Sequence, residues 1–167
     1  MTAEPPGDRD RDETPFERAD RNLLELLNEL RVALPGVQVL FAFLLVVPFN
    51  QRFDRMSEFE RDLYFGVLLC TGIAAVLLIA PSMHHRLEFR HRDKEYLVEE
   101  ANRLTIAGLS FLAVAMTGAI ALITHLLFGT AATVVTTAAV LLAFGVIWYV
   151  IPLRRLAAVR RRHAPRE

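Results

Sequence analysis

The sequence predicts an all-α polytopic membrane protein, a four-transmembrane-helix bundle with two cytoplasmic amphipathic helices. Two observations lead to this prediction. The chain contains four long apolar runs without Asp, Glu, Lys or Arg, and its 19 Lys and Arg residues are divided very unevenly among the segments between them. An apolar content of 53% beside 23% charged residues, with a mean hydropathy of only +0.32, indicates that the charges are segregated from the spans.

The four apolar runs are residues 32–49, 63–81, 104–128 and 131–153. A helix needs about 20 residues, with a range of about 17–25, to cross a hydrocarbon core of about 30 Å, and all four runs fit. A charge at mid-membrane would cost at least about 2.5–3.5 kcal/mol on the insertion scale. We therefore predict a four-span membrane domain over residues 16–155. A disordered cytoplasmic tail (1–15) precedes it and a basic cytoplasmic tail (156–167) follows it.

The distribution of basic residues predicts that both termini are cytoplasmic. In a four-span protein, the N-terminal segment, the middle loop and the C-terminal segment lie on one side, and together they hold sixteen Lys and Arg. The opposite side holds three, Arg52, Arg55 and Arg61. Cytoplasmic loops carry the excess of Lys and Arg, so this ratio sets the orientation.

Two segments that precede spans are expected to form the amphipathic helices. Helical spacing of apolar residues leads up to the first span and is then interrupted by Pro35 and Gly36, which predicts an interfacial helix that kinks into the bilayer. The residues with this spacing are Leu23, Leu26, Leu27, Leu30 and Leu34. A second charged helix, roughly 87–103, is expected before the third span, with Glu99 four residues before Arg103 in the order that favours an ion pair.

The two halves of the chain also show a weak internal similarity. At an offset of 72 residues, Arg31 aligns with Arg103 and Gly36 with Gly108. Two parallel copies of a unit made of an amphipathic helix and two spans would explain this. Chance similarity between two apolar hairpins is the alternative.

The third span carries a polar face. Arg103, Ser110, Thr117 and Thr124 recur every seven residues, with His125 beside them at the outer end. One interpretation is helix packing, including a homo-oligomer, because small and hydroxylated residues let membrane helices approach closely. The other is a hydrated permeation path, in which His125 would be a candidate proton relay.

The residues offer no catalytic centre, and we predict a protein that is not an enzyme and has no cofactor. There is no nucleophile with a paired base and no glycine-rich phosphate loop. His84, Glu88 and His91 share a helical face with spacing that could bind a transition metal. Loops rich in Arg produce such sets by chance, so no metal site is predicted. The net charge of zero predicts no nucleic-acid partner.

Basic residues are concentrated at the C-terminal end. Besides setting the topology, they are candidates to bind anionic lipid headgroups, which attract each basic residue near the surface by about 1 kcal/mol. These residues are Arg154, Arg155, Arg160, Arg161 and Arg162.

Two stretches resemble a known family. Residues 25–53 (ELLNELRVALPGVQVLFAFLLVVPFNQRF) and 85–112 (HRLEFRHRDKEYLVEEANRLTIAGLSFL) are similar to small actinobacterial four-span membrane proteins of unknown function. The resemblance covers about residues 20–155 and implies a bacterial plasma membrane. Some members carry the label sodium:proton antiporter. Such exchange generally needs an acidic residue within the membrane, and the predicted spans contain none.

Together these patterns favour an uncharacterised plasma-membrane protein that binds lipid or protein partners without catalysis. The alternative is a small oligomeric channel or a cation or proton transporter that uses the hydroxyl face of the third span.

Overall fold

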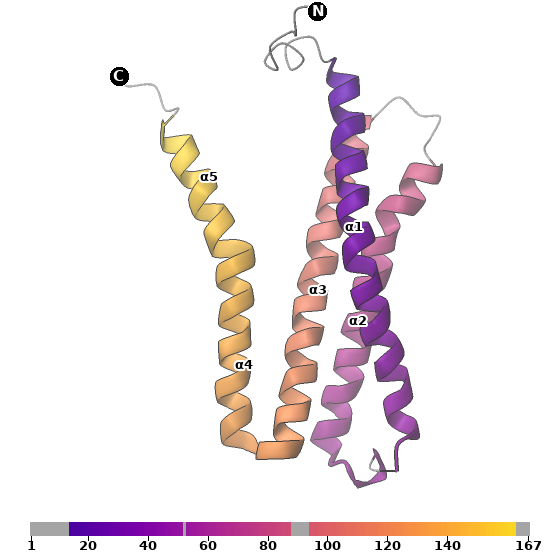
Figure 1. Ribbon diagram of the computed structural model, residues 1–167, viewed down its shortest axis with the longest axis vertical. Helices are drawn as coiled ribbons and strands as arrows, with labels where there is room; N and C mark the ends of the chain where they lie inside the picture. The colour runs from indigo at the N-terminus through magenta and orange to yellow at the C-terminus, as the bar shows by residue number, and fades with distance from the viewer. Residues whose placement is uncertain (1–13, 52, 88–93, 163–167) are drawn as a thin grey trace, which may run out of the picture. The chain divides into compact units, whose positions relative to one another are not determined.

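The computed structural model describes residues 14–51, 53–87 and 94–162, and every regular element within these ranges is a helix (Figure 1). The long helices are α1 (Pro15–Val46), α2 (Glu58–Leu87), α3 (Lys94–Phe128), α4 (Thr130–Phe144) and α5 (Ile151–Arg162). Two short 3-10 helices, Val47–Phe49 and Phe53–Arg55, join α1 to α2, and a π-helical segment, Gly145–Val150, joins α4 to α5.

Four helical stretches are long and apolar enough to cross a membrane. They are Arg21–Phe49, Glu58–His84, Val98–Phe128 and Thr130–Arg155. Each of the four predicted spans lies inside one of them. The predicted all-α class with four membrane-spanning helices is therefore confirmed, and the chain is a multi-pass membrane protein. Of the predicted tails, residues 1–13 and 163–167 lie outside the described ranges, whereas 156–162 belong to α5.

The expectation of a separate interfacial helix before Pro35 and Gly36 is wrong, because α1 is one helix of 32 residues with Pro35 inside it. At about 1.5 Å per residue, such a helix is about 48 Å long and exceeds the hydrocarbon core of about 30 Å. The charged segment before the third span is likewise the first part of the 35-residue α3. The amphipathic segments are thus helical, as expected, but they are extensions of the spans and not separate interfacial helices.

A repeat of buried positions explains why α1 continues through its proline. Its buried residues recur every seven positions, at Leu23, Leu30, Val37 and Leu44. This line runs unbroken past Pro35, so packing on both sides of the proline holds the helix together. Membrane helices tolerate a proline because neighbouring groups satisfy the freed backbone carbonyl.

Both α2 and α3 follow the same period. The buried line of α2 alternates steps of three and four residues, through Tyr64, Val67, Thr71, Ala74, Leu78 and Pro81. The buried line of α3 has the same spacing and is made mainly of small side chains: Ala101, Thr105, Gly108, Ala115 and Leu122. A repeat of 3.5 residues is the pattern of left-handed coiled-coil packing, and small residues on it permit close helix approach.

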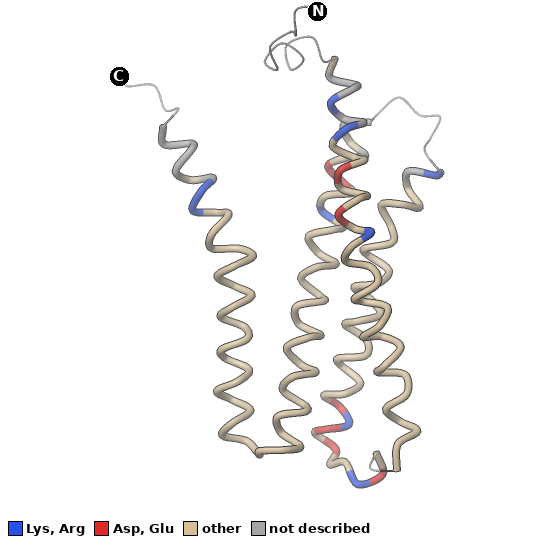
Figure 2. The backbone as a smooth tube through the Cα atoms, viewed as in Figure 1, with Lys and Arg blue, Asp and Glu red and all other residues tan. Residues whose placement is uncertain are grey.

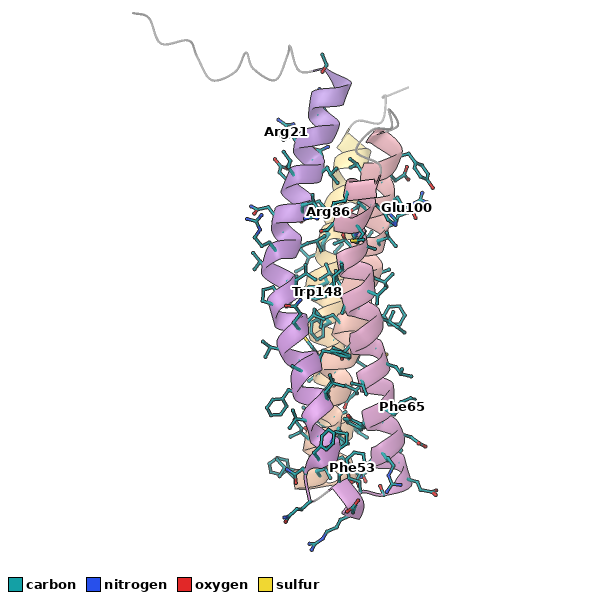
Figure 3. The ribbon with its side chains drawn as sticks, turned by 90° about the vertical axis from the view of Figure 1, so that its right-hand side faces the viewer. Arg21, Phe53, Phe65, Arg86, Glu100 and Trp148 are labelled. Atoms are coloured by element: carbon teal, nitrogen blue, oxygen red, sulfur yellow. The ribbon has the colours of Figure 1, made fainter. Side chains whose placement is uncertain are left out.

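The chain forms two compact units, and α2 and α3 contribute to both. The first contains α1 with the adjoining Val47 and the range Thr71–Phe111. Within it, Leu23 of α1 and Ala101 of α3 are buried together, with Leu26, Leu27 and Val98 packed against them. The charged residues of α1, α2 and α3 gather at one end of this unit (Figure 2), where Arg21, Arg86 and Glu100 are seen in Figure 3.

The second unit contains Pro48–Cys70 and the chain from Leu112 onward. Gly129 alone connects α3 to α4, with a φ of 80° that favours glycine. Its N–H donates to the carbonyl of His125, and its own carbonyl accepts from the N–H and the hydroxyl of Thr133. A single residue therefore reverses the chain direction without leaving these backbone groups unpaired.

Large apolar side chains cover the outside of the helices. Phe65 on α2 is 56% exposed and projects away from the helices in Figure 3, and no residue of α4 is buried. In water such a surface would drive aggregation. In a bilayer the acyl chains cover it, which is the environment that the composition predicts.

The close approach of Gly118 on α3 to Val67 on α2 can be tested by substitution. A Cβ at Gly118 would lie 2.5 Å from Cγ2 of Val67, whereas a Cβ at Gly66 would meet nothing within 4 Å. We expect Gly118→Ala to destabilise the protein by about 1–3 kcal/mol, because α2 and α3 must separate. Gly66→Ala, the same change at an open position, should leave the melting temperature in nanodiscs unchanged or slightly higher. Equal melting of the two variants would contradict the close contact.

Candidate functional site

The predicted polar face of the third span lies opposite the buried line of α3. Thr117 comes two positions after the buried Ala115, which is about 200° around the helix. Arg103 at one end of this face is exposed and forms the expected ion pair with Glu99, with 2.6 Å between Nη2 and Oε1. Toward the other end, Thr124 and His125 are half-buried. The residues do share one face, but their environments differ from end to end.

Two hydroxyls of this face, those of Ser110 and Thr117, are bonded within their own helix. Ser110 Oγ donates to the carbonyl of Ile106 at 2.7 Å, and Thr117 Oγ1 donates to that of Ala113 at 2.7 Å. Such bonds to the carbonyl four residues earlier are the usual local solution for Ser and Thr in a helix. They occupy the one proton that each hydroxyl can donate.

Thr117 is also buried, together with Ala113 and Ala121 on the same face. Small side chains at steps of four residues, covered on the outside, are what helix packing requires. Ser110 remains partly exposed. The arrangement therefore resembles a packing face more than a hydrated path over the half of α3 that belongs to the second unit.

A hydroxyl on α4 differs from these. Thr137 Oγ1 is buried and has no hydrogen-bond partner within the described part of the chain. Its neighbour one turn earlier, Thr133, donates to the carbonyl of Gly129 at 2.8 Å. On this face of α4, therefore, the hydroxyl of Thr133 has a hydrogen-bond partner and that of Thr137, one turn later, has none among the described residues.

The basic end of the chain is helical. Arg154 and Arg155 are exposed near the start of α5, and Arg160, Arg161 and Arg162 belong to the same helix. No charged residue lies between Thr130 and Leu153. The first two arginines thus follow the end of an apolar span directly.

A π-helical turn connects this basic helix to the span. The N–H of Ile151 donates to the carbonyl of Val146, five residues earlier. Pro152 follows at once and has no N–H to donate. Local widening of this kind lets a membrane helix absorb a proline, so α4 and α5 continue without a loop. Just before the end of the wide segment, Trp148 packs its ring edge-on against Phe144 at 4.9 Å between centroids.

A polar cluster that the sequence analysis did not predict lies at the start of α2. Ser57 N–H donates to Oε2 of Glu60 at 2.8 Å, while Glu60 N–H donates to Oγ of Ser57 at 3.3 Å. This reciprocal pair is a capping box, which satisfies two orphan donors at a helix N-terminus. Its signal, Ser followed three residues later by Glu, is present in the sequence and could have been found.

The same glutamate approaches His125. Oε1 of Glu60 lies 3.9 Å from Nε2 of His125, and their side chains are only 13% and 25% exposed. The ring of Phe59 meets the imidazole edge-on at 5.7 Å between centroids. The structure therefore gives His125 a carboxylate partner from the first turn of α2.

The residues considered as metal ligands cannot be assembled into a site. His84 is half-buried near the end of α2, whereas Glu88 and His91 lie outside the described ranges. Among the described residues no group of three His, Cys, Asp or Glu side chains could hold a metal ion. The absence of a metal centre stays a prediction.

Comparison with known proteins identifies a family. A family model described as a family of unknown function, DUF6328, matches residues 12–152. No curated protein matches the chain, and no solved structure matches it. The family match confirms the expected resemblance to proteins of unknown function. It supports neither an actinobacterial source nor the antiporter label.

Proposed function

The chain belongs to the DUF6328 family of unknown function, and we propose that it is a non-enzymatic membrane component that binds anionic lipid headgroups through α5. The observation that carries this proposal is the continuous exit from the fourth span. The chain is helical from Thr130 to Arg162 and changes from wholly apolar to basic at Arg154. A basic helix is thereby held at the edge of the apolar region.

The chemistry of the arginines supports this assignment. A guanidinium presents several donors in a planar fork that matches a phosphate, and it stays charged at any physiological pH. Each basic residue near an anionic surface contributes about 1 kcal/mol of attraction. The exposed Arg154 and Arg155 are the first basic residues of this helix, and three further arginines lie one to two turns along it, on the side predicted to be cytoplasmic.

The other charged region is less suited to lipid. We call it the stem: residues 21–31 of α1 with residues 96–103 of α3. The apolar residues of the stem pack against each other inside the protein, because Leu23 and Ala101 are buried in one cluster. Its exposed charges have both signs, including Arg21, Glu25 and Glu99. A surface of mixed charge complements a protein better than an anionic membrane, so a protein partner at the stem is the second candidate function.

The lipid proposal predicts a loss of anionic-lipid affinity on neutralising the first two arginines of α5. Replacing Arg154 and Arg155 by Gln removes about 2 kcal/mol of attraction, which corresponds to a roughly 30-fold weaker enrichment of phosphatidylglycerol around the protein. Lipid enrichment in mixed nanodiscs measures this. Replacing Arg55 and Arg61, which lie near the opposite end of the spans, is the matched control and should leave that enrichment unchanged on the predicted cytoplasmic side. Equal enrichment by wild type and the α5 double variant would refute the proposal.

A protein partner at the stem predicts position-dependent cross-linking in cells. A photoreactive phenylalanine analogue replacing the exposed Glu25 should yield a discrete product of higher mass, because the stem would lie against the partner. The same analogue at Phe65, on the apolar exterior of α2, is the control and should yield no such product. Discrete products from Phe65 and none from Glu25 would move the partner from the stem into the membrane.

The channel alternative makes a different prediction. Because the hydroxyls of Ser110 and Thr117 are bonded to their own helix, we expect the purified protein in liposomes to conduct no ions. Ala at Ser110, Thr117 and His125 should then change nothing in a flux assay. Flux by the wild type that these substitutions abolish, with folding intact, would establish the channel in place of our proposal. Self-association through this face stays a prediction, tested by the oligomeric state of Ser110→Leu with Thr117→Leu in nanodiscs.

A further inference from the structure

We infer that Glu60 and His125 form a pH-dependent tie between the beginning of α2 and the end of α3. Glu60 lies at the beginning of α2 and His125 near the end of α3. Oε1 of Glu60 and Nε2 of His125 lie 3.9 Å apart. Both belong to the second unit. The inference concerns the end of the spans predicted to face outward, and it does not depend on the proposed lipid binding at α5.

Each partner is positioned by a separate interaction. The capping box with Ser57 directs the Glu60 carboxylate by engaging Oε2, which leaves Oε1 toward the imidazole. On the other side, the Phe59 ring packs against His125. His125 is one turn before Gly129, and its carbonyl accepts the Gly129 N–H at 3.1 Å. The tight turn into α4 therefore holds the backbone that carries the imidazole.

The strength of this contact depends on the charge of the imidazole. Histidine is the side chain whose charge ordinarily changes between pH 5 and 8. When His125 is protonated, an imidazolium faces a carboxylate, and limited exposure of both side chains reduces solvent screening. When His125 is neutral, the charge attraction is absent. The tie therefore requires the protonated imidazole, the form that acid favours.

Other charges near the pair are exposed and therefore well screened. They are Asp54 and Arg55 on the short helix before α2, and Glu58, Arg61 and Asp62 on α2 itself. Arg61 is held near another group, with its guanidinium carbon 6.0 Å from the ring centre of Phe53. The following helix, α4, contains no titratable residue. Glu60 is thus the carboxylate placed to respond to His125.

The consequence is a change in how firmly the outward ends of α2 and α3 are joined. At acidic pH the ion pair adds to the close approach of Gly118 to Val67, about two helical turns into the membrane. At alkaline pH the helix ends keep that contact and the ring contact between Phe59 and His125. The protein would thereby sense the pH on the side of the membrane that the distribution of basic residues assigns to the exterior.

Thermal unfolding in nanodiscs at pH 5.5 and pH 8.0 tests the tie through the difference between the two melting temperatures. Glu60→Gln removes the charge while Gln can still complete a capping box. In the wild type the ion pair should raise the melting temperature at pH 5.5 relative to pH 8.0. We expect Glu60→Gln to reduce this difference by about 2–4 °C, the shift that a partly buried ion pair produces in a chain of this size. His125→Gln should lose the same amount, and the double variant should lose no more than either single one.

Glu58→Gln is the matched control, because it removes an exposed charge from the same turn and should keep the wild-type difference. The comparison is between pH values within each variant, so a uniform loss of stability does not affect it. The tie is refuted if Glu60→Gln keeps the full wild-type difference, or if Glu58→Gln abolishes it as well.

Discussion

The close approach of α2 and α3 is the constraint on which most of the described packing depends. In the first unit a Cβ at Gly108 would lie 2.8 Å from the Leu78 side chain, and in the second unit a Cβ at Gly118 would lie 2.5 Å from Val67. Within lipid there is no hydrophobic gain from bringing apolar helices together, so association must come from intimate van der Waals contact. Small residues repeated at a spacing of 3.5 provide that contact, because they keep the same line of α3 facing its neighbour along its length.

Packing with this repeat of 3.5 residues also explains why the helices extend beyond the hydrocarbon core of the bilayer. The line of buried residues on α1 begins at Leu23, well before the first uncharged run, and its partner Ala101 on α3 also precedes an apolar run. Side chains outside the hydrocarbon core are therefore buried by the same repeat that operates inside it. When the apolar line of an amphipathic segment packs against another helix, the segment has little free apolar surface to bind a membrane. It becomes a rigid extension with charges of both signs on its exposed side.

The ends of the spans differ in chemistry. At the end predicted to be cytoplasmic, Arg154 and Arg155 follow an apolar helix without a loop, made possible by the wide turn before Pro152. At the other end the principal feature is a single His–Glu pair, Glu60 and His125, set beside a capping box and a glycine turn. The proposed lipid contact depends on arginines that stay charged at any physiological pH, whereas the proposed tie depends on a histidine. The groups that carry the two proposals lie near the ends of the spans.

The sequence by itself determined the all-α class, the four spans and the Glu99–Arg103 pair, because these depend on composition and spacing along a single helix. It also contained the seven-residue polar face of α3. Tertiary structure decided what that face meets: Thr117 is buried, Arg103 is exposed, and His125 has a carboxylate partner. It also joined the segment before Pro35 to the first span in one helix, since packing on both sides of a proline can outweigh its local cost. Local pattern predicts which residues share a helix face, but only the packing of separate helices decides which of those residues find a partner.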